Sequence, residues 1–278
     1  FLGEVIKTNI ISTFTALIIT GIFLFLTGDS VISFIPAIYL GLIGICQIGI
    51  VTTKIRLPSN ILSSIDIITI KHLGGFMIMA MGSFFMTPVA LVTIRGWLIQ
   101  DYGTDSAGDW ESSRKLLELI TGLLTTYFAM VLLPKLAKIS ESKILRLEVI
   151  NNAIALMALS SIALFLLYLL RDQVYYVVFS SDFKFSSDLM GSRAIGEFLR
   201  VLVWVFGFIL VVKAKVKLYL AIGFFYMLVL LCISWFMIAD YGMIGANYAY
   251  IISNSLMLLL SVIIFYNITS ESYLENKL

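Results

Sequence analysis

The sequence predicts an all-α membrane protein that crosses the bilayer several times. Hydrophobic residues make up 60% of the 278 residues, charged residues only 13%, and the mean hydropathy is +1.02. Soluble domains average about 45–50% apolar and about 25% charged residues. The polar stretches are all short, so no soluble globular domain fits between the apolar segments. The net charge of +2 is too small to indicate nucleic acid as a partner.

Apolar segments of the right length predict eight spanning helices, because a span needs about 20 mostly apolar residues. They cover residues 9–27, 31–52, 73–95, 115–133, 151–170, 193–212, 218–238 and 243–266. Polar stretches separate them, and "QDYGTDSAGDWESSRK" (100–115) is predicted to be the most polar loop. A polar stripe of Asn247, Tyr248, Tyr250 and Asn254 on the last segment fits either cavity lining or hydrogen bonding between helices.

The order of the segments predicts an incomplete first lobe and a complete second one. Residues 1–52 are interpreted as the last two helices of an N-terminal lobe, and 53–72 as a cytoplasmic or interfacial connector. Residues 73–266 then form a six-helix C-terminal lobe, followed by a cytoplasmic tail, 267–278. The first residues lack the basic region and cleavage site of a signal peptide, so we expect the sequence to begin inside a longer protein.

The distribution of basic residues predicts the orientation. Twelve of the 19 lysine and arginine residues fall on one side if the N-terminus of the chain is cytoplasmic, and seven fall on the other. Cytoplasmic loops carry the excess of basic residues, so both ends of the chain are predicted to be cytoplasmic.

Two charges in "GEFLRVLVWVFGFILVVKAKVK" (196–217) are predicted to lie within the bilayer. If Lys213 marks the cytoplasmic boundary, Arg200 lies about 20 Å and Glu197 about 24 Å along the helix at 1.5 Å per residue. The hydrocarbon core is about 30 Å thick. Charged side chains at such depth usually face a bundle interior or a wet cavity.

Other charges lie at similar depth, and together they predict a cavity that binds an anionic headgroup. Arginine suits this role because its planar fork binds phosphate in a bidentate manner. The candidate substrate-binding residues are Arg95, Arg114, Glu118, Arg193, Glu197 and Arg200. No metal-ligand spacing, GxSxG motif or P-loop occurs, so the sequence predicts neither an enzyme nor a cofactor.

Several motifs resemble one family when their order and spacing are taken together. They are "AGDW" (107–110), "LLPKLAKI" (132–139), "LLRDQVYYVVFSSDF" (169–183), the 196–220 stretch and "DYGMIGANYAY" (240–250). The chain resembles the Wzx-type flippases of the MATE-like polysaccharide-exporter superfamily, which translocate O-antigen or enterobacterial common antigen repeats. By this resemblance Arg95, Glu118, Glu197 and Arg200 match charged positions of the family, whereas Arg114 has no clear counterpart.

The resemblance implies twelve helices in two six-helix lobes around a basic cavity in the bacterial inner membrane. The implied substrate is an undecaprenyl-pyrophosphate-linked glycan used for surface polysaccharide and lipopolysaccharide biosynthesis. The implied partners are membrane lipids, a polysaccharide polymerase and a chain-length regulator.

Two alternative functions remain open at the level of sequence. A cation or drug antiporter of the same superfamily would have a cavity dominated by acidic and aromatic residues, and the arginines argue against it. A membrane polysaccharide polymerase or ligase would be expected to carry a large extracytoplasmic loop, which this sequence lacks.

Overall fold

The structure, a computed structural model, describes residues 67–139, 141–178 and 184–275. The chain divides into two compact units, Phe1–Asp66 and Ile67–Leu278, and all described residues belong to the second. Within the described part every element is helical, and five helices are long and apolar enough to cross a membrane. The predicted all-α, polytopic membrane class is confirmed. The predicted spans 9–27 and 31–52 lie outside the described residues.

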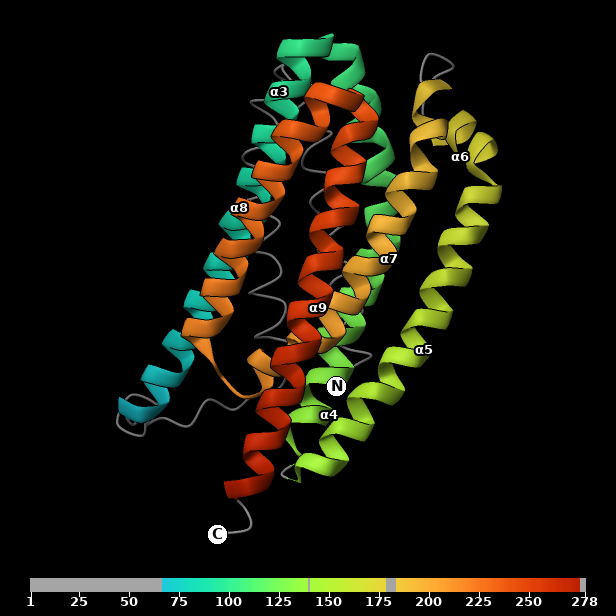
Figure 1. Cartoon of the computed structure of the whole chain (residues 1–278). Coiled ribbons are helices and arrows are strands. Elements are labelled where there is room, and N and C mark those ends of the chain that lie inside the picture. The colour runs from blue at the N-terminus through green and yellow to red at the C-terminus, as the bar shows by residue number, and fades with distance from the viewer. Residues whose placement is uncertain (1–66, 140, 179–183, 276–278) are drawn as a thin grey trace, which may run out of the picture. The chain divides into compact units, whose positions relative to one another are not determined.

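The helix α3 (Ile67–Tyr127) is a helical hairpin rather than one straight rod. Its one non-helical residue is Gly103 (φ 85°, ψ 171°), a conformation that glycine adopts without steric cost. Figure 1 shows the first arm of α3 running up beside α8 and the second arm returning downward. At 1.5 Å per residue each arm is long enough to cross a core about 30 Å thick.

The predicted loop at 100–115 is therefore wrong, since these residues are helical apart from Gly103. The polar composition indicates that this segment is in contact with water. A helix can also present polar side chains to water while its backbone N–H and C=O groups bond to one another. One consequence concerns Arg114 and Glu118, which lie inside the second arm rather than at the start of a helix.

The second arm continues through a π-helix into a short helix at the opposite end. The π-helix η2 covers Phe128–Leu132 and α4 covers Leu133–Ala137. The next helix along the chain is α5 (Ser142–Leu169), which is followed by the short helix α6 (Arg171–Val178).

Three long helices complete the described part of the chain. They are α7 (Lys184–Val212), α8 (Val216–Tyr241) and α9 (Met243–Glu275). The predicted spans 193–212, 218–238 and 243–266 fall inside them. Short turns at Ala214 (φ 50°) and Gly242 (φ 63°) reverse the chain between these helices.

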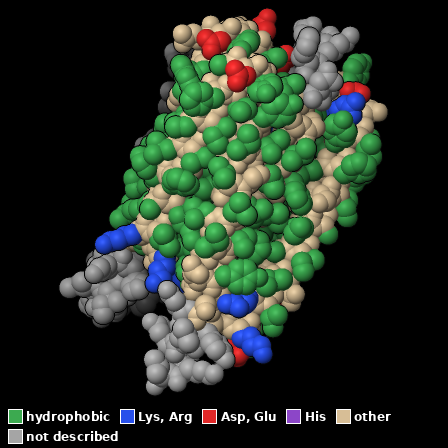
Figure 2. Space-filling view, in the orientation of Figure 1, with side chains coloured by type: hydrophobic (Ala, Val, Ile, Leu, Met, Phe, Trp, Pro, Cys, Tyr) green, Lys and Arg blue, Asp and Glu red, His purple; other side chains and the backbone are tan. Residues whose placement is uncertain are grey.

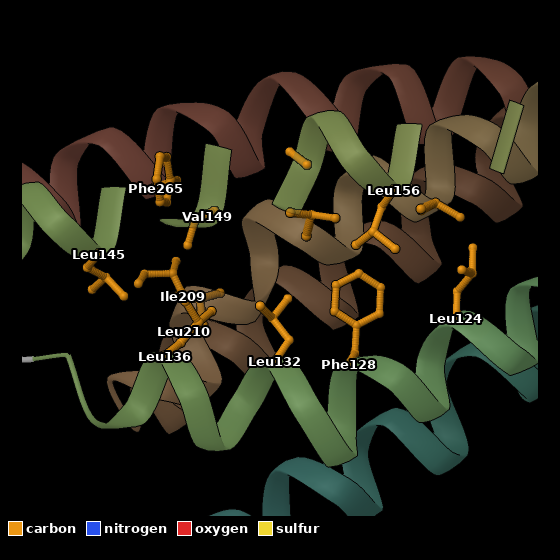
Figure 3. Packing of buried hydrophobic residues seen from close by; sticks show 13 residues of the cluster. Leu124, Phe128, Leu132, Leu136, Leu145, Val149, Leu156, Ile209, Leu210 and Phe265 are labelled. Atoms are coloured by element: carbon orange, nitrogen blue, oxygen red, sulfur yellow. The ribbon is translucent and has the colours of Figure 1, made fainter. Parts of the chain in front are cut away.

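Buried apolar residues fix the second arm of α3 against α5, α7 and α9. Figure 3 shows this cluster, which continues through η2 and α4. Four residues of this cluster come from the second arm of α3, η2 and α4: Leu124, Phe128, Leu132 and Leu136. They recur every four positions, so they lie on one helical face. A second cluster packs the first arm of α3 against α8 and α9 around Trp110, which is 1% exposed.

The surface of the described unit is largely apolar between two polar ends. In Figure 2 hydrophobic side chains cover the middle of the visible face, lysine and arginine gather toward its lower end, and most acidic side chains lie at its upper end. Large side chains such as Leu123 (75% exposed) and Phe236 (66% exposed) face outward. An apolar surface of this extent indicates contact with lipid or with another apolar body.

Gly245 allows the close approach of α9 to the end of α8, and a side chain there should be destabilising. A Cβ atom at this position would overlap the backbone carbonyl of Met237, which cannot rotate away. Gly245→Ala is expected to lower the free energy of unfolding by about 1–3 kcal/mol, measured as a lower melting temperature in detergent. Gly122→Ala is the control, because nothing lies within 4 Å of a Cβ there. Equal melting temperatures for Gly245→Ala and the wild type would contradict this packing.

Candidate functional site

The buried ion pair of α7 joins Arg193 to Glu197. Arg193 Nε and Nη2 donate to Glu197 Oε1 at 3.2 and 2.9 Å, and both residues are 0% exposed. The Arg193 guanidinium also lies over the ring of Tyr250, with Cζ 3.7 Å from the ring centroid. A buried charge is costly unless it is paired and hydrogen-bonded. The spacing of four residues on one helix supplies that pairing.

Tyr250 of α9 connects this pair to Arg200. Its hydroxyl donates to Glu197 Oε1 at 3.1 Å and accepts from Arg200 Nη1 at 3.1 Å. Arg200 Nη1 is also 3.6 Å from Glu197 Oε1, and its guanidinium lies 4.4 Å from the ring centroid of Trp204. The phenol thus fixes the positions of an arginine and a carboxylate that lie one turn apart on α7.

A second charged group lies on the second arm of α3. Arg114 binds Glu111 through two nitrogens, with Nε 3.0 Å from Oε2 and Nη2 in contact with Oε1. Its Nη1 donates to Glu118 Oε1 at 2.5 Å. That same oxygen lies 3.6 Å from Arg200 Nη1, so Glu118 connects α3 to α7. The two groups therefore form one network in which positive and negative side chains alternate.

A cavity of about 900 Å³ opens beside this network. Residues of α3, η2, α7, α8 and α9 line it, and its charged lining residues are Glu111, Arg114, Lys115, Glu118 and Arg200. Aromatic and aliphatic residues make up much of the remaining wall, including Phe128, Trp204, Phe208 and Met257. The cavity can therefore accept a ligand that has both an anionic and an apolar or sugar-like part.

The predicted site residues fall into three groups. Arg114, Glu118 and Arg200 line the cavity. Arg193 and Glu197 are fully buried behind it and reach it through Tyr250 and Arg200. Arg95 is exposed on the first arm of α3 and is absent from the cavity lining, so its role in binding stays a prediction.

Sequence reasoning missed two charged residues of the cavity, Glu111 and Lys115. Glu111 precedes Arg114 by three residues, a spacing that brings side chains together only on a helix. Because the sequence predicts a loop at 100–115, it does not predict a contact between Glu111 and Arg114. Among the described residues no group of three histidine, cysteine or acidic side chains could hold a metal ion.

The polar stripe of α9 serves both of the purposes left open by the sequence. Asn247 bonds between helices, accepting from Trp110 Nε1 at 3.2 Å and donating to Ser192 Oγ at 3.0 Å. Asn254, by contrast, lines the cavity. Tyr250 is buried and joins helices through its hydroxyl.

Comparison with known proteins finds two similar sequences. No family model and no solved structure matches the chain. The chain is 27% identical over 179 residues to a protein named lipid III flippase from Escherichia coli (strain K12), and equally similar to its namesake from Shigella flexneri. The match covers 64% of this chain and 43% of each relative. The chain is similar to flippases. The match therefore spans less than half the length of each relative.

Gly196 makes room for the Tyr250 ring, and a methyl group there should disturb the network. A Cβ at Gly196 would overlap Tyr250 Cδ1 and lie 2.9 Å from Cε1. Gly196→Ala is expected to displace the hydroxyl from Glu197 and Arg200, and to lower the free energy of unfolding by about 1–3 kcal/mol. The control is Gly207→Ala, where the nearest atom is Ser261 Oγ at 3.9 Å. If both variants melt at the temperature of the wild type, the ring is free to move and the predicted constraint does not exist.

Proposed function

We propose that this chain is part of a flippase that translocates undecaprenyl-pyrophosphate-linked oligosaccharide repeat units, of the O-antigen or enterobacterial common antigen type, across the bacterial inner membrane. Transport would proceed by alternating access and would supply surface polysaccharide and lipopolysaccharide biosynthesis. The observation that carries this proposal is the cavity in which Arg114, Lys115 and Arg200 face one space in a chain similar to flippases.

The chemistry of the cavity suits a pyrophosphate bound to a sugar and a lipid. Arginine binds phosphate oxygens through its fork and stays charged. Lysine adds a compact charge beside it. The aromatic wall that contains Trp204 and Phe208 offers an apolar surface to the rest of the headgroup.

The charges of the cavity favour an anion over a cation. The lining contains three basic and two acidic residues, and both acidic residues are already paired with Arg114. A cation antiporter would need carboxylates that are free to receive the cation, which is why we prefer the flippase to the antiporter.

The proposed orientation places the lysine-rich end of the unit in the cytoplasm. That end holds the turns before α5 and before α8, which carry Lys138, Lys213 and Lys215. The opposite end holds the Gly103 hairpin and the α8–α9 turn, which carry Asp101, Asp105 and Asp240. Basic residues are retained on the cytoplasmic side, so the hairpin is assigned to the periplasm.

Transport by the full-length protein in proteoliposomes tests the proposal. The substrate is a fluorescent undecaprenyl-pyrophosphate oligosaccharide, and a reductant that cannot cross the membrane reports which leaflet holds it. Faster exchange than in protein-free vesicles is expected, and a fluorescent organic cation should not accumulate. Movement of the cation without movement of the lipid would contradict the proposal and favour the antiporter.

A further inference from the structure

Glu118 occupies a special place among the three carboxylates of the network. Its Oε1 atom lies 2.5 Å from Arg114 Nη1 and 3.6 Å from Arg200 Nη1. The two arginines come from different helices, α3 and α7. The cavity-lining guanidinium groups of Arg114 and Arg200 therefore both contact the same oxygen of Glu118.

The other two carboxylates are fixed in ways that Glu118 is not. Glu197 is 0% exposed, accepts three hydrogen bonds through Oε1 and does not line the cavity. Glu111 binds Arg114 in a bidentate manner one turn away on the same helix. Glu111 and Glu118 both line the cavity with side chains that are 22% exposed. Glu118 differs because it contacts two arginines and holds each through a single nitrogen.

Both arginines would remain partly paired if Glu118 moved away. Arg114 would keep its two bonds to Glu111, and only Nη1 would be released. Arg200 would keep its bond to Tyr250 and its ion pair with Glu197. Its Nε is buried and has no hydrogen-bond partner within the described residues.

From this geometry we infer that Glu118 is an internal substitute for the anionic ligand. In the empty cavity it neutralises Arg114 and Arg200, and a phosphate group displaces it and takes over both contacts. When the ligand leaves, Glu118 returns and restores the pairs, so it lowers affinity and promotes release. This inference rests on the proposed function, because it assumes a ligand that carries phosphate.

Binding measurements on the full-length protein in nanodiscs test the inference with two probes, inorganic pyrophosphate and undecaprenyl pyrophosphate. Glu118→Gln removes the charge but keeps the size, and it is expected to bind both probes about tenfold more tightly or better. Glu118→Asp keeps the charge but is too short to reach both arginines, and it should give a smaller gain. Glu148→Gln is the matched control, because Glu148 pairs with Lys135 outside the cavity.

Transport by the same variants separates competition from a structural role. With Glu118→Gln both KM and kcat for the lipid-linked glycan should fall, because the ligand binds more tightly and leaves more slowly. If the wild type binds the probes and Glu118→Gln binds them equally or more weakly, the inference is wrong and the proposed function stands. If neither protein binds either probe, the proposed function fails and the inference fails with it. Tighter binding of undecaprenyl pyrophosphate alone, with no binding of inorganic pyrophosphate, supports the inference for the lipid headgroup only.

Discussion

Arg193→Met is expected to lower the free energy of unfolding by about 3–5 kcal/mol, because it leaves the Glu197 carboxylate buried without its main partner. Both side chains are 0% exposed, and two of the three hydrogen bonds to Glu197 Oε1 come from Arg193. The remaining cation, Arg200, lies 3.6 Å away. The measurement is the melting temperature and the yield of folded, monodisperse protein in detergent.

A double variant shows whether the loss comes from the unpaired charge. Replacing both partners of a buried pair by apolar residues of similar volume is often neutral. Arg193→Met combined with Glu197→Met is therefore expected to recover most of the stability that Arg193→Met loses. Arg171→Met on α6 is the matched control, because its ion pair with Asp172 is 3.8 Å long and only partly buried, and surface pairs contribute about 0–1 kcal/mol. A double variant no more stable than Arg193→Met would contradict this account.

The helices of the described unit could be predicted from hydropathy, and the ends of the helices could not. The spans 193–212 and 218–238 lie within α7 and α8 because long apolar runs admit few other structures in a bilayer. The sequence predicts a loop at 100–115 because the side chains of this segment are polar. Polar side chains indicate contact with water. A helical hairpin that turns at one glycine exposes its side chains to water just as a loop does.

Contacts within one helix could be predicted, and contacts between helices could not. A spacing of four residues brings side chains together on a helix, and Arg193 and Glu197 pair at that spacing. The link from Arg200 to Glu118 joins two helices, and no spacing in the sequence encodes it. The same limit applies to Tyr250: the sequence predicts a polar position on α9, but not that its hydroxyl bridges Glu197 and Arg200.

If the chain has the proposed function, Arg200→Ala is expected to reduce transport of the lipid-linked glycan by about 30–150-fold, the effect of losing a charge-assisted interaction of about 2–3 kcal/mol. Arg200 lines the cavity, touches Glu118 and Tyr250, and lies over Trp204. Arg200→Lys keeps the charge but lacks the planar fork that fits a phosphate. Its transport should lie between that of the wild type and that of Arg200→Ala. The measurement is the initial rate of transport in proteoliposomes at equal protein content.

Two further arginine variants decide whether the loss is specific to the cavity. Arg171→Ala changes an arginine outside the cavity lining, and it should transport within about twofold of the wild type, since surface changes of this kind are usually small. Arg95→Ala tests the residue that the sequence predicts but the described cavity does not include. Arg95 does not line the cavity, so it can act on a phosphate there only by longer-range attraction, which is weaker than a direct charge-assisted hydrogen bond. Arg95→Ala should therefore lose less transport than Arg200→Ala if the described cavity binds the headgroup. An equal loss of transport in Arg95→Ala and Arg200→Ala would show that the binding surface includes the first arm of α3. If Arg200→Ala transports as fast as the wild type, α7 does not bind the phosphate, because no other arginine of that helix lines the described cavity.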